Sequence, residues 1–369
     1  MPSASSKRAQ APRGTAAFVD HNAERFHVKP GRAITHQFAS LYFTRLNELR
    51  SHVEAVASAR SGPDILKTSV KTLDAEPGAP VFVVGTIYCD MKGKPNLADD
   101  VNRDVLEAST AGQIATSTAK YCAEGDTILL EDESGRLALR LSPALSDEAL
   151  VTGAVVGVKG TVTEAGELEV DSIYLPGMGP QAPMGPAGSE SHATERYIAL
   201  VSGLRVGNDA HDMLPLQLLA EHLTGQLGCD EDHRLQANIV RLVIAGNATG
   251  CPPAGESDSA LGSFGSDVLK KMAASDQTSL AQHVRTLDQF LTTVSAAMPV
   301  DLMPGADDPC NFLLPQQPFH PCLLPQSSQL STLNLCTNPY CCDVDGVRVL
   351  GTAGQPLDDM QRFAAFQKH

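Results

Sequence analysis

The stretch YIALVSGLRVG, residues 197–207, decides the fold of the second half of the chain. A short apolar run leads directly into a loop that contains glycine, which is typical of a buried strand ending in a tight turn. The same order of features recurs in residues 239–247 (IVRLVIAGN) and 300–309 (VDLMPGADDP). The predicted strands are residues 197–201, 239–245 and 300–303.

Helical segments separate these strands. Residues 214–227 have helical character, with Pro215 tolerated in the first turn. A second helix follows a loop of small and polar residues, and one of its faces carries Leu280, Val284, Leu287, Leu291, Val294 and Met298. Another strand is predicted at residues 347–350. Strands that alternate with helices predict a layered α/β domain, in which functional groups lie where strands end.

The first half of the chain is rich in predicted β-structure. Residues 80–88 (PVFVVGTIY) form the first strand of this part. Two hairpins follow, and their strands are residues 126–130, 136–141, 154–162 and 167–174. Five strands with hairpin turns and one longer excursion suit a small Greek-key barrel such as an OB-fold. On periodicity alone, a β-sandwich fits nearly as well.

Three segments flank or separate these parts. An amphipathic helix is predicted before the barrel, because apolar residues recur at helical spacing: Phe38, Leu41, Tyr42, Leu46, Leu49, Val53 and Val56. Residues 176–191 are rich in Pro and Gly and predict a linker between two domains. Residues 1–13 are basic and lack acids, yet they are short and show no apolar face, so we expect a disordered tail rather than a transit peptide.

The composition limits the classes of function. A formal net charge of −15, from 43 acidic and 28 basic side chains, disfavours autonomous binding to nucleic acid, because affinity for phosphates comes mainly from Lys and Arg. The chain has no Trp and only 6 Tyr, which leaves few platforms for stacking bases. No apolar run approaches the roughly 20 residues that span a bilayer, and no secretory signal is visible. We therefore expect an intracellular protein that contacts other proteins.

The nine cysteines do not form a C-x-x-C pair, so neither a zinc ribbon nor a redox motif is indicated. Cys336, Cys341 and Cys342 cluster in the sequence, and a metal site is one interpretation of that cluster. Reduced, partly buried thiols are the interpretation that the spacing favours.

The three strand-end loops resemble, in order and spacing, those of calcineurin-like metallophosphoesterases. In that family the strand ends carry D-x-H, G-D-x-x-D and G-N-H-[DE] motifs, whose side chains hold two metal ions. This sequence reads Gly203-Leu204-Arg205, Gly246-Asn247-Ala248-Thr249-Gly250 and Gly305-Ala306-Asp307-Asp308. The vestigial positions are Gly203, Arg205, Asn247, Gly250, Ala306, Asp307 and Asp308. The resemblance implies a site without catalytic residues, metal or other cofactor, since Arg205 would repel a cation and two carboxylates cannot assemble a dinuclear centre.

A barrel that precedes an inactivated phosphoesterase-like domain resembles the B-type accessory subunits of eukaryotic replicative DNA polymerases. Within that group, the polymerase delta small subunits are the most similar. The stretches that carry this resemblance are LVTGAVVGVKGTV (150–162), YIALVSGLRVG (197–207), PVDLMPGADDP (299–309), LPQQPFHPCLLP (314–325) and TNPY with DGVRVLGTAGQ (337–355). Phe319 and His320, within these stretches, are expected to pack rather than to catalyse.

The resemblance implies a domain organisation. We expect a tail at residues 1–35, a helix and OB-fold domain at 36–180, a linker at 181–192 and an inactive phosphoesterase-like domain at 193–369. In the family this last domain continues for longer, so the sequence is expected to lack its closing strands and to be truncated at its C-terminus.

The resemblance also implies a function and a location. We expect a non-catalytic nuclear scaffold in DNA replication and repair that binds two partners of polymerase delta. These are the cysteine-rich C-terminal domain of the catalytic subunit and the third, clamp-binding subunit; the catalytic subunit of polymerase zeta is a further candidate. Contact with DNA would be indirect, and no membrane is involved. An active metal-dependent phosphodiesterase or nuclease and a single-stranded DNA-binding OB protein are the alternatives from other classes.

Overall fold

The computed structural model describes residues 12–28, 39–62, 67–72, 78, 80–94, 120–123, 125–142, 145, 150–179, 195–207, 213–250, 274–311 and 313–364. The chain divides into two compact units. The first, here called the layered unit, comprises residues 1–32 and 183–355. The second, here called the barrel unit, comprises residues 33–182 and 356–369. Residues 33–182 of the barrel unit are thus inserted in the sequence of the layered unit, and residues 356–369 follow it.

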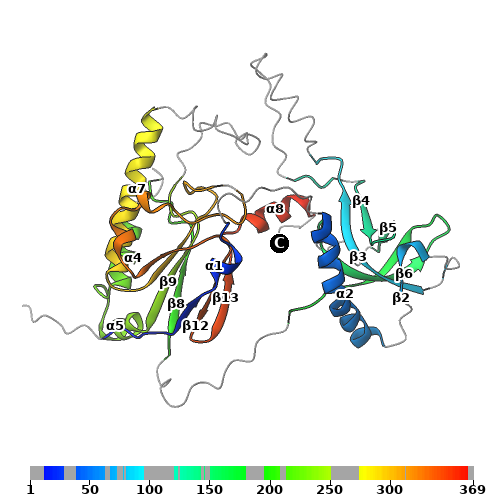
Figure 1. The fold of residues 1–369 in the computed structure, drawn as a ribbon, viewed down its shortest axis with the longest axis horizontal. Coiled ribbons are helices and arrows are strands. Elements are labelled where there is room, and N and C mark those ends of the chain that lie inside the picture. Colours follow the sequence, from blue (N-terminus) through cyan, green and yellow to red (C-terminus); the bar gives the residue numbers. More distant parts are fainter. Residues whose placement is uncertain are drawn as a thin grey trace, which may run out of the picture. The chain divides into compact units, whose positions relative to one another are not determined.

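The barrel unit is built on one closed sheet (Figure 1). Its strands are β2 (Lys67–Thr68), β3 (Pro80–Asp90), β4 (Thr127–Glu131), β5 (Arg136–Leu141), β6 (Val155–Val162) and β7 (Leu168–Tyr174). They are ordered β2-β3-β4-β5-β7-β6, and β3 also pairs with β6, which closes the sheet. The five strands predicted for this part are confirmed, and closure through β3 and β6 selects a barrel over a sandwich.

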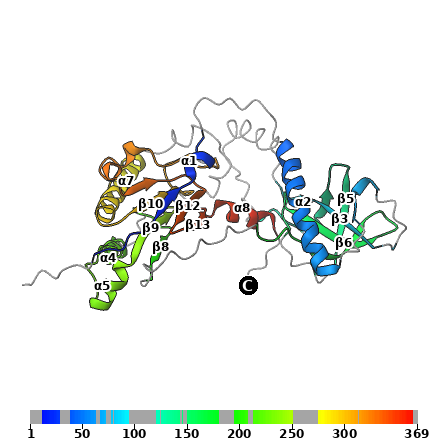
Figure 2. The same ribbon diagram turned by 60° about the horizontal axis from the view of Figure 1, so that its bottom comes forward.

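Strand β3 is buried on both of its faces because different groups cover them. Val81 and Val83 point into the core of the barrel, whereas Phe82 and Val84 pack against α2 (Ala39–Ser61). This alternation is the period-two pattern of a strand, with apolar residues on both sides. Figure 2 shows α2 lying along the barrel. The short 3-10 helix η1 (Val70–Thr72) follows β2.

Helix α2 confirms a helix at the predicted place, but the predicted apolar stripe is buried over only part of its length, and its first residue, Phe38, lies outside the described residues. Leu46, Val53 and Ala57 are buried against the barrel. Leu41 and Tyr42, which belong to the same predicted stripe, are exposed. The stripe therefore extends beyond the face of the barrel that covers it.

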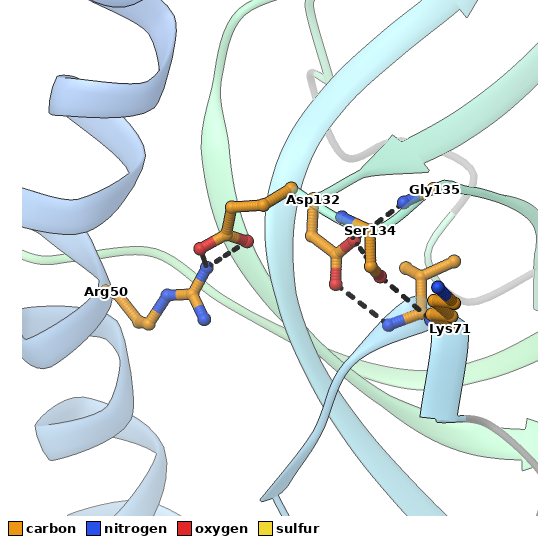
Figure 3. Close-up of polar contacts among 7 residues, drawn as sticks. Arg50, Lys71, Asp132, Ser134 and Gly135 are labelled. Carbon is orange, nitrogen blue, oxygen red and sulfur yellow. Dashed lines mark hydrogen bonds and ion pairs between the residues drawn. The ribbon is translucent and has the colours of Figure 1, made fainter.

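A polar contact also holds α2 on the barrel. Arg50 Nη2 donates to both carboxylate oxygens of Glu133 over 2.6 Å (Figure 3). Glu133 lies in the turn between β4 and β5. Asp132 Oδ2, in the same turn, accepts from the N–H of Val70 over 2.8 Å, which fastens the turn to η1.

The last helix, α8 (Gln355–Phe363), belongs to the barrel unit for all but its first residue. Its end contacts the segment before β4. The N–H of Tyr121 donates to the carbonyl of Arg362 over 2.8 Å, and the rings of Tyr121 and Phe363 lie 5.1 Å apart between their centres. The chain thus returns to the barrel unit after residue 355.

The layered unit contains two sheets. A parallel sheet has the order β11-β10-β9-β8, with β8 (Tyr197–Val201), β9 (Ile239–Ala245), β10 (Val300–Met303) and β11 (Leu333–Leu335). A smaller antiparallel sheet has the order β1-β12-β13, with β1 (Phe18–Asp20), β12 (Tyr340–Val344) and β13 (Val347–Gly351). The helices among the described residues of this unit are α1 (Asn22–Arg25), α4 (Met213–Leu223), α5 (Asp230–Ala237) and α7 (Ala274–Ser295), with 3-10 turns η3 (Pro321–Leu323) and η4 (Ser327–Gln329).

Two cores hold the layers of this unit together. Leu242 and Ile244 of β9 pack with Leu287 and Leu291 of α7 on one face of the parallel sheet. Val240 of β9, on the other face, packs with residues of the antiparallel sheet. The order of layers is therefore helices, parallel sheet and second sheet, and Figure 1 shows α7 and β12 on opposite sides of β9. This arrangement agrees with the predicted α/β class.

Three predictions need correction or fall outside the described residues. The helix predicted at residues 214–227 ends at Leu223, and a separate helix, α5, follows it. The predicted tail at residues 1–35 is not a tail throughout, because β1 pairs with β12 of the layered unit. The predicted linker at residues 181–192 lies outside the described residues. Within the described part of the chain, no helix has the length and apolar character needed to cross a membrane.

Candidate functional site

The loops that follow β8 and β9 are joined by backbone hydrogen bonds. The N–H of Gly203 donates to the carbonyl of Gly246 over 3.1 Å, and the N–H of Arg205 donates to the carbonyl of Asn247 over 3.1 Å. Parallel strands bring their carboxyl ends to the same edge of a sheet, which places these loops together. Gly203, Arg205, Gly246 and Asn247 all have positive φ angles, so each strand turns sharply into its loop.

The loop after β10 completes the group. The N–H of Asp307 donates to Asn247 Oδ1 over 3.1 Å. Gly246 and Gly305 lie back to back: a Cβ atom on Gly305 would come within 2.3 Å of the backbone nitrogen of Asn247. Only glycine permits so close an approach of two backbones. The sequence-predicted positions therefore do converge at one edge of the parallel sheet.

Asp308 occupies the centre of this edge, and its carboxylate accepts four hydrogen bonds. Oδ1 accepts from the N–H of Thr249 over 2.8 Å and from its hydroxyl over 2.9 Å. Oδ2 accepts from the N–H of Gly305 over 2.7 Å and from the N–H of Ala248 over 3.2 Å. The residue is only 3% exposed. A carboxylate has about four lone-pair positions, so these donors occupy all of them.

The chemistry open to Asp308 follows from these contacts. Burial raises the pKa of its carboxyl group above the ordinary value, and the hydrogen bonds from Thr249, Gly305 and Ala248 oppose that shift. Without a free lone pair, the carboxylate has no oxygen to offer to a metal ion. The arrangement makes Asp308 a brace that fastens the loop after β10 to the loop after β9.

The remaining predicted positions add little ligating capacity. Ala306 and Arg205 are exposed, and Asp307 is half-buried. Gly250 is buried and donates its N–H to the carbonyl of Val206 over 3.0 Å. Among the described residues, no group of three or more His, Cys, Asp or Glu side chains is placed to hold a metal ion.

Two amides at this edge were not identified from the sequence. Gln316 donates from Nε2 to the carbonyl of Gly305 over 2.8 Å, and its Oε1 accepts from Asn338 Nδ2 over 3.1 Å. Asn338 also bonds to Gln355 Oε1 and to the N–H of Ala353. Both Gln316 and Asn338 are buried. The only signal in the sequence is that each lies beside a proline in a stretch that carries the family resemblance.

Phe319 packs as expected, whereas the expectation that His320 packs is wrong, because His320 is exposed. Phe319 is 1% exposed in the helix-side core of the layered unit. His320 precedes the 3-10 turn η3, where its Nδ1 accepts from the N–H of Cys322 over 3.2 Å. Neither the position of Phe319 nor the contact of His320 indicates a catalytic role.

The geometry disfavours a metal site at the cysteine cluster. Cys341 and Cys342 are adjacent in β12, so their side chains point to opposite faces of the sheet. Cys336 and Cys342 both lie in the core between the two sheets. Burial raises the pKa of the Cys342 thiol to about 11 and raises the pKa of Cys336 well above its ordinary value. Such thiols stay protonated at neutral pH and act as core residues.

The chain matches two family models of polymerase accessory subunits. The model of the DNA polymerase delta subunit OB-fold domain matches residues 37–173. The model of the B subunits of DNA polymerases alpha and epsilon matches residues 198–369. The fold thus belongs to the class of B-type accessory subunits of DNA polymerases, with an OB-fold in the barrel unit.

Individual relatives show which family within this class the chain belongs to. A DNA polymerase delta small subunit from Oryza sativa subsp. japonica is 35% identical over 92% of this chain and 73% of its own length. One from Arabidopsis thaliana is 36% identical over 94% of this chain and 73% of its own length. DNA polymerase delta subunit 2 from Drosophila melanogaster is 32% identical over 91% of this chain and 73% of its own length. This chain belongs to the family of DNA polymerase delta small subunits, which confirms the resemblance stated from the sequence.

Proposed function

We propose that the chain is a non-catalytic scaffold of DNA polymerase delta that bridges its catalytic subunit and the third, clamp-binding subunit in DNA replication and repair. The observation that carries this proposal is the similarity to polymerase delta small subunits, over more than nine-tenths of the chain for the two plant relatives. The site at the parallel sheet supports a scaffold, because its buried carboxylate, Asp308, braces loops. Such a role places the protein in the nucleus.

The loops at the parallel sheet are proposed to be a degenerate phosphoesterase centre. The order of layers and the convergence of three strand-end loops support a common ancestry with two-metal phosphoesterases. Asp308 occupies one position of the third motif, and its lone pairs serve backbone donors. Arg205 occupies a position that an imidazole would need for metal binding. The fold of the family would thus be retained while its chemistry is lost.

Loss of the ancestral chemistry has a measurable consequence. The purified chain is expected to leave bis-p-nitrophenyl phosphate and single-stranded oligonucleotides intact with Mn²⁺, Mg²⁺ or Zn²⁺, since a two-metal mechanism needs several ligands that converge. Hydrolysis is followed by absorbance and by gel electrophoresis. Metal-dependent turnover that Asp308→Ala abolishes, in a variant that remains folded, would show instead that the centre is active.

The partners follow from the proposed family role. We propose that separate faces of this chain bind the cysteine-rich C-terminal domain of the catalytic subunit and the clamp-binding subunit. The catalytic subunit of polymerase zeta is a further candidate. Contact with DNA would then be made through the other subunits. The net charge of −15 supports this indirect role.

Reconstitution tests the scaffold directly. When the chain is co-expressed with the catalytic subunit and the clamp-binding subunit of its own organism, size-exclusion chromatography is expected to give one ternary peak. Omitting this chain should separate the other two subunits. If the two subunits co-elute equally well without it, the chain is not the bridge.

A further inference from the structure

We draw no further inference here: the strongest candidate, the cavity of about 390 Å³ in the layered unit that Asp20, Arg241 and Asn334 line, carries nothing, because Arg241 and Asn334 donate hydrogen bonds to the buried carboxylate of Asp301 and Asn334 donates another to Asp20, so that these opposite charges serve the fold and do not select a ligand of either charge.

Discussion

Replacing Asp308 with alanine is expected to lower the free energy of unfolding of the layered unit by about 3 kcal/mol, at the upper end of what single substitutions do. The variant would leave the N–H groups of Ala248, Thr249 and Gly305, and the Thr249 hydroxyl, without their acceptor. Each buried donor left unsatisfied costs about 1–3 kcal/mol, and the removal of a buried charge returns part of that sum. Urea denaturation and hydrogen exchange of residues 246–250 measure the effect.

The controls separate the brace from a general effect of charge. Asp307→Ala keeps the backbone contacts of residue 307, so we expect a change within about 0.5 kcal/mol. Asp308→Asn retains one acceptor oxygen but turns an amide toward backbone donors, so its loss should lie between those of the two alanine variants. Wild-type stability in Asp308→Ala would mean that water or a rearranged loop replaces the carboxylate. The structural account of this edge would then be wrong.

Most strands could be predicted because apolar runs were bounded by turn residues. Strands β5, β9 and β10 have the predicted bounds residue for residue. Helix α5 was missed because its sequence, DEDHRLQA, is polar and short. Its amino end is instead stabilised by Asp232, whose Oδ2 accepts from the N–H of Cys229 over 2.8 Å. That contact is local, but the residues around it have no apolar period to reveal a helix.

The candidate site could be located from the sequence but not understood from it. Glycines after apolar runs identified the three loops, and parallel strands brought them together as expected. The role of Asp308 depends on donors from two loops separated by about 60 residues, and three of those donors are backbone groups. Backbone N–H groups are present in every residue type except proline, so no pattern of side chains could indicate that role.

Strand β1 was missed for a related reason. Its three residues have no repeating pattern, and they form a strand only because the edge of β12 offers a partner. Phe18, Val19 and Asp20 pair with Val344, Asp343 and Cys342. The contact joins residues more than 300 positions apart, across the inserted barrel unit. Composition alone makes such a segment look like a tail.

The amino-terminal segment is expected to be essential to the layered unit. Arg13 Nη1 donates to the carbonyl of Ile239 over 2.7 Å, and Gly14 donates its N–H to the carbonyl of Ala237 over 2.8 Å. Arg13 also bonds to the carbonyls of Gln236 and Leu223. Phe18 lies against Arg241, with 3.5 Å between the guanidinium carbon and the ring centre. Arg241 in turn forms a buried ion pair with Asp301 over 2.6 Å.

Deleting residues 1–20 should therefore lower the free energy of unfolding of the layered unit by about 3–5 kcal/mol. That is a large share of the stability of an ordinary domain. The deletion removes the hydrogen bonds from Arg13 to buried carbonyls. It also exposes the face of the Arg241 guanidinium that the Phe18 ring covers, in the ion pair with Asp301. Differential scanning calorimetry should show a lower transition temperature for this unit and an unchanged one for the barrel unit.

Val19→Ala, at a side chain that is 52% exposed, is the point control and should change the transition little. A synthetic peptide of residues 12–20, added in trans, should restore the transition, whereas its scrambled version should not. Equal melting of the deletion and the wild type would show that β1 is dispensable and that the antiparallel sheet closes with β12 and β13 alone.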